Sequence, residues 1–238
     1  PAGKYPVRRV DGDGVRGDRV FNGSAGHGEW AGFTPFGRST WEGFVPFEAI
    51  PHLENPEYVG TANQRVVDDP GFYMGTSRNF ASPYRGARVY ELLEEHVDSD
   101  EPVTMADLKD MQRDTHSLAA EGFTPLILNA TDEMPQRAAD LVEDAGLASW
   151  DYEMVPDSEA ALVYRRWLEH YRNLTFRDEY SAAGLDEGYY PRVWVLQHLP
   201  TDSPWFDDER TSRLETREDI VARAMNETVT ELESEGWE

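Results

Sequence analysis

The residue pattern changes near residue 84, and this change limits the folds open to the chain. Before it, the sequence is rich in glycine and proline and holds short β-like runs at residues 5–10 and 57–67. After it, apolar residues recur at the spacing of amphipathic helices. The sequence therefore predicts an α+β, mainly helical fold, with a β and loop segment over 1–84 and a helical segment over 85–238.

Start and stop signals place five or six helices in the second segment. Thr104, with Asp107 three residues later, is typical of a capping box at a helix start. Val163, Trp167 and Tyr171 are four residues apart, which places them on one face of a helix. We expect helices over residues 85–97, 104–122, 135–146, 158–173 and 215–234, and a shorter helix or strand over 190–199.

The composition excludes some classes of partner. The chain carries 46 acidic and 22 basic residues, a net charge of −24, and its only lysines are Lys4 and Lys109. Such acidity excludes nucleic acid as a partner, because phosphate binding needs a cationic surface. It fits a protein adapted to high salt, where repulsion is screened. Disorder is the alternative, but 12% aromatic residues and seven tryptophans argue against it.

Other features of the sequence bound the compartment only weakly. There is no cysteine, which excludes disulfides and thiolate chemistry. There is no long apolar run, so we expect no membrane partner. The compartment stays open between export and the cytoplasm of a high-salt organism. The six histidines are scattered, and no metal site is predicted from their spacing.

A polar residue in the middle of the second β-like run is a candidate for chemistry. Asn63 follows three small residues, Gly60, Thr61 and Ala62, which leave room for a ligand to approach. A side-chain amide can donate a hydrogen bond to an oxyanion. The alternative is that Asn63 only bonds the backbone at the end of a strand. The residue types alone do not decide between the two.

Several blocks of the sequence, in this order, resemble the penicillin acylase (penicillin amidase) family of N-terminal-nucleophile hydrolases. The resemblance covers nearly the whole chain and is strongest between residues 41 and 117. The blocks are Trp41 to Pro46, Asn55-Pro56 with Tyr58 to Asn63, Tyr84-Arg85 with Arg88-Val89, and Gln112 to Thr115, with weaker landmarks at Trp150-Asp151 and Trp205 to Asp208.

The resemblance implies roles for five residues. Asn63 would be the asparagine of the oxyanion hole, and Arg88 would support it or contact the leaving group. Arg85 is the alternative arginine and a candidate substrate contact. Trp41 and Phe44 could touch an apolar acyl group, with core packing as the alternative for both. The fold implied is a fragment of an αββα sandwich together with its helical part.

One departure from the family is large. The family's nucleophile is a Ser, Thr or Cys at the start of its β chain, whose free amine serves as the base, whereas this chain begins Pro1-Ala2. We therefore expect an internal piece of the β chain, one incomplete domain that is inactive alone. Its partners would be the α chain and the N-terminal part of the β chain.

The resemblance also implies an activity for the parent protein. It would cleave an amide between an apolar acyl group and an amine, of the β-lactam or acyl-homoserine-lactone type. No cofactor is expected, although a calcium ion in the full-length enzyme stays open and its ligands are not identifiable here. The alternative is a non-catalytic helical interaction domain with acylase-like sequence.

Overall fold

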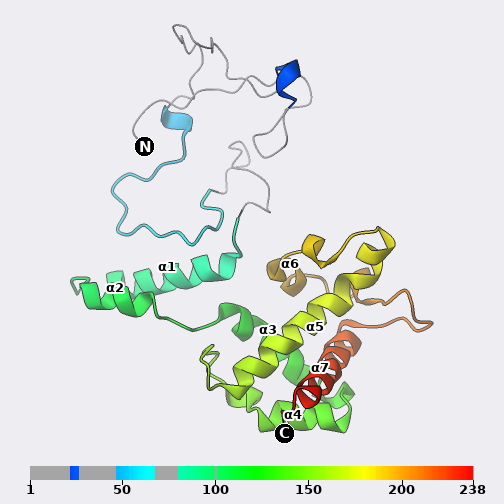
Figure 1. Cartoon of the computed structure of the whole chain (residues 1–238). Coiled ribbons are helices and arrows are strands. Elements are labelled where there is room, and N and C mark those ends of the chain that lie inside the picture. The colour runs from blue at the N-terminus through cyan, green and yellow to red at the C-terminus, as the bar shows by residue number, and fades with distance from the viewer. Residues whose placement is uncertain (1–21, 27–46, 68–79, 100, 238) are drawn as a thin grey trace. The chain divides into compact units, whose positions relative to one another are not determined.

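The computed structural model describes residues 22–26, 47–67, 80–99 and 101–237 (Figure 1). The chain divides into two compact units, Pro1–Ala81 and Ser82–Glu238. The boundary lies within three residues of the change in pattern near residue 84.

The described part of the first unit is irregular. It holds two 3₁₀ turns, η1 at Gly23–Ala25 and η2 at Phe47–Ala49, and residues 51–67 form no strand. The strand predicted over 57–67 is therefore wrong for this chain. Asn63 has a φ of 63°, which bends the run in its middle, and strand backbone persists only where a neighbouring strand pairs with it. The strand predicted over 5–10 lies outside the described residues.

The second unit is helical, as the mainly helical fold class predicted. Within its described residues there is no strand, and a single isolated bridge joins His116 to Glu153. Its α-helices are α1 (Pro83–Asp98), α2 (Met105–Met111), α3 (Leu118–Asn129), α4 (Gln136–Asp144), α5 (Glu159–Ala182), α6 (Val193–Gln197) and α7 (Arg217–Ser234). Its 3₁₀ turns are η4 (Thr131–Glu133), η5 (Leu147–Ser149), η6 (Glu187–Tyr189) and η7 (Pro204–Phe206).

Local capping explains where most of these helices begin. The capping box predicted at Thr104 forms with Asp107 at the start of α2. Ser158 caps α5 by accepting from the backbone N–H of Ala161 at 3.2 Å. A second capping box, Thr216 with Asp219, starts α7. These side chains satisfy backbone donors that a helix N-terminus leaves unpaired.

The single helix predicted over 104–122 is wrong, because the structure has two helices there, α2 and α3. After α2 the chain turns at residues 112–113 and then pairs with residues 152–154: the backbone N–H of Ser117 donates to the Tyr152 carbonyl at 3.0 Å, and that of Met154 donates to the Thr115 carbonyl at 2.9 Å. Gly122, expected as a stop signal, lies inside α3. A Cβ there would lie 1.8 Å from Nε2 of Gln197, so this glycine makes room for a side chain of α6.

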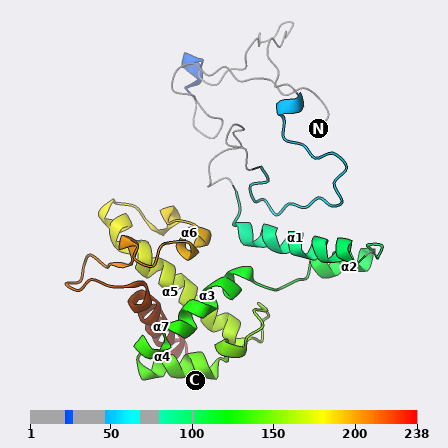
Figure 2. The ribbon, with the colours of Figure 1, turned by 180° about the vertical axis from the view of Figure 1, so that it is seen from behind.

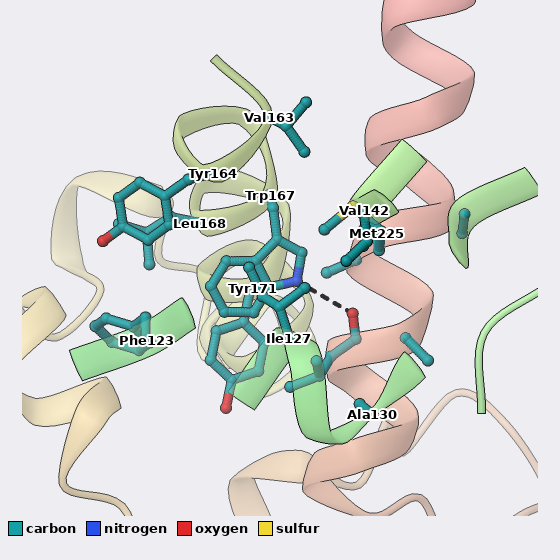
Figure 3. Packing of buried hydrophobic residues seen from close by; sticks show 14 of the residues in the cluster. Phe123, Ile127, Ala130, Val142, Val163, Tyr164, Trp167, Leu168, Tyr171 and Met225 are labelled. Atoms are coloured by element: carbon teal, nitrogen blue, oxygen red, sulfur yellow. Dashed lines mark hydrogen bonds between the residues drawn. The ribbon is translucent and has the colours of Figure 1, made fainter. Parts of the chain in front are cut away.

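The core of the second unit centres on α5. Val163, Trp167 and Tyr171 share one buried face of that helix, as their spacing predicted. The Trp167 and Tyr171 rings stack with centroids 4.8 Å apart. The indole Nε1–H of Trp167 donates to the Val221 carbonyl of α7 at 3.1 Å (Figure 3). The α5 helix, predicted to end at Asn173, continues to Ala182.

An ionic seam joins α5 to α7, which lie side by side in both views (Figures 1 and 2). Nε2 of His170 lies 2.7 Å from a carboxylate oxygen of Glu231, and its Nδ1 lies 3.4 Å from one of Glu227. Arg166 also contacts Glu231, at 3.2 Å. The pKa of His170 is raised, first by its hydrogen bond with Glu227 and also by Glu231, against the opposing effect of burial.

We expect this seam to weaken in mild alkali. Because the folded state raises the pKa of His170, its contribution to the unfolding free energy is complete below the ordinary pKa of 6.5 and is lost as pH rises through the folded pKa. Denaturant titrations between pH 6 and 9 should show the wild-type chain losing stability relative to His170→Gln.

The comparison with His170→Gln is needed because a second group, Glu179, titrates in an overlapping pH range. Burial raises the pKa of Glu179 to about 7 from 4.5, which also lowers stability as pH rises, between those two values. That effect is common to both proteins and cancels in their difference. Parallel pH curves for the two proteins would contradict a role for His170.

Candidate functional site

The turn around Asn63 is the first part of the candidate site. Asn63 takes up the left-handed conformation, with a φ of 63°, which asparagine tolerates better than most residues. Its carbonyl accepts from the backbone N–H of Ala81 at 2.7 Å, and its own N–H donates to the Thr61 hydroxyl at 3.3 Å. The side chain of Gln64 accepts from the buried Ala62 N–H at 2.6 Å. The turn is thus closed by hydrogen bonds on both sides of Asn63.

Asn63 differs from its neighbour Ala62 in exposure. Asn63 is exposed to solvent, whereas the neighbouring Ala62 is buried and anchors the turn. Backbone hydrogen bonds hold the residue through its main chain. The catalytic value of any oxyanion-hole donor depends on a preorganised position of the donor group.

Arg88 is the second part, and the structure gives it clear partners. Its Nε and Nη2 donate to the two carboxylate oxygens of Asp114 at 3.1 and 2.8 Å, a bidentate pair. Its Nη1 donates to Glu91, one helical turn along α1, at 3.2 Å. The pKa of Arg88 is raised, first by the hydrogen bond to Asp114, and that of Asp114 is lowered, first by Arg88.

Of the other three candidates, the structure describes only Arg85. Arg85 is exposed on α1, next to the buried Gly86. Trp41 and Phe44 lie outside the described residues. Asn63 and Arg88 belong to different units, so the structure describes the two halves of the candidate site separately.

The structure brings together two of the sequence blocks that carried the resemblance. Arg88 comes from the block at residues 84–89 and Asp114 from the block at 112–115, and the two residues form one ion pair. Asp114 was not among the residues predicted from the sequence. The only signal in the sequence was that the block at 84–89 carries arginines and the block at 112–115 carries one acid, Asp114, beside Arg113.

No group of three or more His, Asp or Glu among the described residues is arranged to hold a metal ion. None of the described helices combines the length and the apolar character needed to cross a membrane.

A surface groove lies between α4 and α7 and contains none of the candidate residues. Its volume is about 220 Å³. Apolar side chains of Leu141, Val229, Leu232 and Trp237 line it together with charged residues. The groove is a feature of the helical unit alone.

The sequence was compared with those of known proteins. The family model described as Penicillin amidase matches residues 1–238. The chain is 28% identical over 208 residues to the acyl-homoserine lactone acylase QuiP of Pseudomonas fluorescens (strain Pf0-1), covering 78% of this chain and 25% of that protein. It is 25% identical over 258 residues to the protein of the same name from Pseudomonas syringae pv. syringae, covering 98% of this chain and 28% of that protein.

The chain thus spans about a quarter of the length of the curated relatives it matches. The family match, in contrast, extends over every residue of the chain, including both halves of the candidate site. The chain belongs to the penicillin amidase family.

Proposed function

We propose that this chain is part of an acylase-like amidohydrolase that cleaves an amide between an apolar acyl group and an amine. The observation that carries the proposal is the match to the penicillin amidase family over residues 1–238. The exposed Asn63 on its hydrogen-bonded turn supports it. Relatives named acyl-homoserine lactone acylases favour substrates of the acyl-homoserine-lactone type, with β-lactam amides as the other candidate class.

The reaction would proceed through an acyl-enzyme. The hydroxyl of an N-terminal serine attacks the amide carbon, and its proton passes through the free α-amine to the departing amine. The carbon–nitrogen bond breaks, and water then hydrolyses the serine ester to release the carboxylic acid. In both steps Asn63 donates a hydrogen bond from its amide NH₂ to the negative oxygen of the tetrahedral intermediate.

The remaining roles follow from the same proposal. Arg88, held by Asp114 and Glu91, supports the oxyanion-hole asparagine or meets the leaving group. Arg85 is the candidate for a substrate contact from the exposed face of α1, and Trp41 and Phe44 are candidates for contact with the acyl group. The nucleophile comes from the remainder of the acylase, so the 238-residue chain alone is inactive.

Substitution of Asn63 tests the proposal in the acylase that contains this chain. We expect Asn63→Ala to lower kcat by about 10²- to 10³-fold, because one oxyanion donor is lost. Hydrolysis of phenylacetyl and long-chain acyl chromogenic amides, in molar salt, gives the rate. Circular dichroism checks that the fold is intact.

Two further variants distinguish the loss of the Asn63 side-chain amide from the cost of changing a residue that has a positive φ. Asn63→Gly removes the side chain while keeping a residue that favours positive φ, and it should be as inactive as the alanine variant. Asn55 is also exposed and has a positive φ of 48°, so Asn55→Ala imposes a similar backbone cost and should keep its activity. Full activity in Asn63→Gly would refute the oxyanion role.

A further inference from the structure

The ion pair between Arg88 and Asp114 is more constrained than a surface pair. Three nitrogens of the guanidinium are engaged by two carboxylates. The Arg88 and Asp114 side chains are only 23% and 17% exposed. In contrast, the nearby pair of Arg113 with Asp110 spans 3.7 Å, and both of its side chains are about three-quarters exposed. Pairs of the exposed kind contribute little, because water screens them.

Asp114 is itself held in place by the fold. It lies between α2 and α3, where its backbone N–H donates to the Met111 carbonyl at 3.4 Å and the carbonyl of the next residue, Thr115, accepts from the backbone N–H of Met154 at 2.9 Å. The Thr115 hydroxyl also hydrogen-bonds the Glu153 carboxylate. Asp114 therefore links Arg88 to the 152–154 segment, because that segment holds the residue next to Asp114.

The same helix has a second attachment, one turn earlier. The hydroxyl of Tyr84 donates to Oε1 of Gln197, in α6. The Tyr84 ring meets Trp194 edge to face, with centroids 5.6 Å apart. Gln197 lies over Gly122, where the missing side chain leaves room for it. Tyr84 and Arg88 are four residues apart, so the two attachments fix the rotation of α1 about its axis.

From these contacts we infer that Asp114 is a positioning residue, which fixes the turn of α1 that presents Arg85 and Arg88. It acts through Arg88 and does not touch substrate. The inference rests on the proposed acylase function, since the two arginines matter for rate only within that site. A displacement of about 1 Å at a positioning group can lower a rate by about a hundredfold.

The test is Asp114→Asn in the acylase that contains this chain. The substitution keeps the size of the side chain and removes its charge. We expect kcat to fall about tenfold or more while KM changes by less than about threefold, with the folded state intact at the assay temperature. Asp114→Glu restores the carboxylate and should recover part of kcat. Asp110→Asn, which breaks the exposed pair, is the matched control and should behave as wild type.

A structural role alone gives a different result. If Asp114→Asn lowers the melting temperature but leaves kcat unchanged where the protein is folded, the inference is overturned. Loss of kcat in Asp114→Asn without any recovery in Asp114→Glu also overturns it, because a carboxylate would then not be what matters.

Asn63→Ala, measured beside these variants, reports on the proposed function separately. If Asn63→Ala collapses the rate and Asp114→Asn does not, the function stands and the positioning role fails. If Asp114→Asn lowers kcat and Asn63→Ala does not, the positioning role stands and the oxyanion assignment fails.

Discussion

Trp167→Ala should destabilise the helical unit by about 3–5 kcal/mol, the usual range for removing a large aromatic side chain from a core. Trp167 is fully buried. Its ring stacks on Tyr171 and meets Phe123 edge to face, with centroids 6.1 Å apart. The substitution leaves a cavity between α3, α5 and α7, and it removes the donor to the Val221 carbonyl.

The Val221 carbonyl lies inside α7 and keeps its helical hydrogen bond, so the cavity accounts for most of the expected cost. The free energy of unfolding of a domain is usually about 5–15 kcal/mol, so this single change would remove a large part of it. Urea titration of the 238-residue chain, followed by circular dichroism, gives the difference in unfolding free energy.

Trp194→Ala is the matched control. Trp194 is 42% exposed on α6, and its removal opens no enclosed cavity. We expect it to cost about 1 kcal/mol or less, as for most surface substitutions. Equal losses for the two tryptophan variants would show that Trp167 is not the centre of the core.

The second large effect is expected at Asp208, a buried carboxylate after η7. Its side chain is 2% exposed. It accepts from Nε and Nη2 of Arg210 at 2.6 and 2.7 Å, and from Nη1 of Arg223, in α7, at 2.9 Å. The acid thus ties the loop before α7 to the helix itself.

Asp208→Ala should destabilise the unit by about 3 kcal/mol, the lower end of the range for breaking a buried ion pair. The lower end applies because Arg210 and Arg223 are 46% and 36% exposed, so water can solvate the charges left behind. Asp202→Ala, in the same loop and exposed, is the control and should change stability little. Denaturant titration of the three proteins measures the differences.

Asp208 should also make the stability of the unit depend on pH in the acid range. Hydrogen bonds from Arg210 hold the pKa of Asp208 far below its ordinary value of 3.8. Its stabilisation is therefore present above that value and is lost as pH falls through the folded pKa. Stability of the wild type should fall more steeply than that of Asp208→Asn below about pH 4. An identical fall in the unfolding free energy of the two proteins below about pH 4 would contradict this prediction.

The candidate site was only partly readable from the sequence. Asn63 is a candidate because of its small neighbours and the family resemblance, and the structure shows it exposed on a left-handed turn. Arg88 was selected in the same way, but its partner was not. Asp114 lies 26 residues away, and nothing in the local pattern says which of the many acids would reach the arginine.

The sequence by itself determined the features that depend on a few consecutive residues. Thr104, Ser158 and Thr216 start helices because a side chain caps backbone donors within three residues. Val163, Trp167 and Tyr171 form a buried face because their spacing matches the helical period.

The tertiary structure decided the features that need a distant partner. The break between α2 and α3 follows from pairing with residues 152–154, nearly forty positions along the chain. The run at 57–67 forms no strand in the described structure, because a strand depends on a neighbour that its own pattern does not supply. The pairing of Arg88 with Asp114 is of the same kind: charges are visible in a sequence, but which of them meet is set by packing, since Coulomb attraction acts through space and not along the chain.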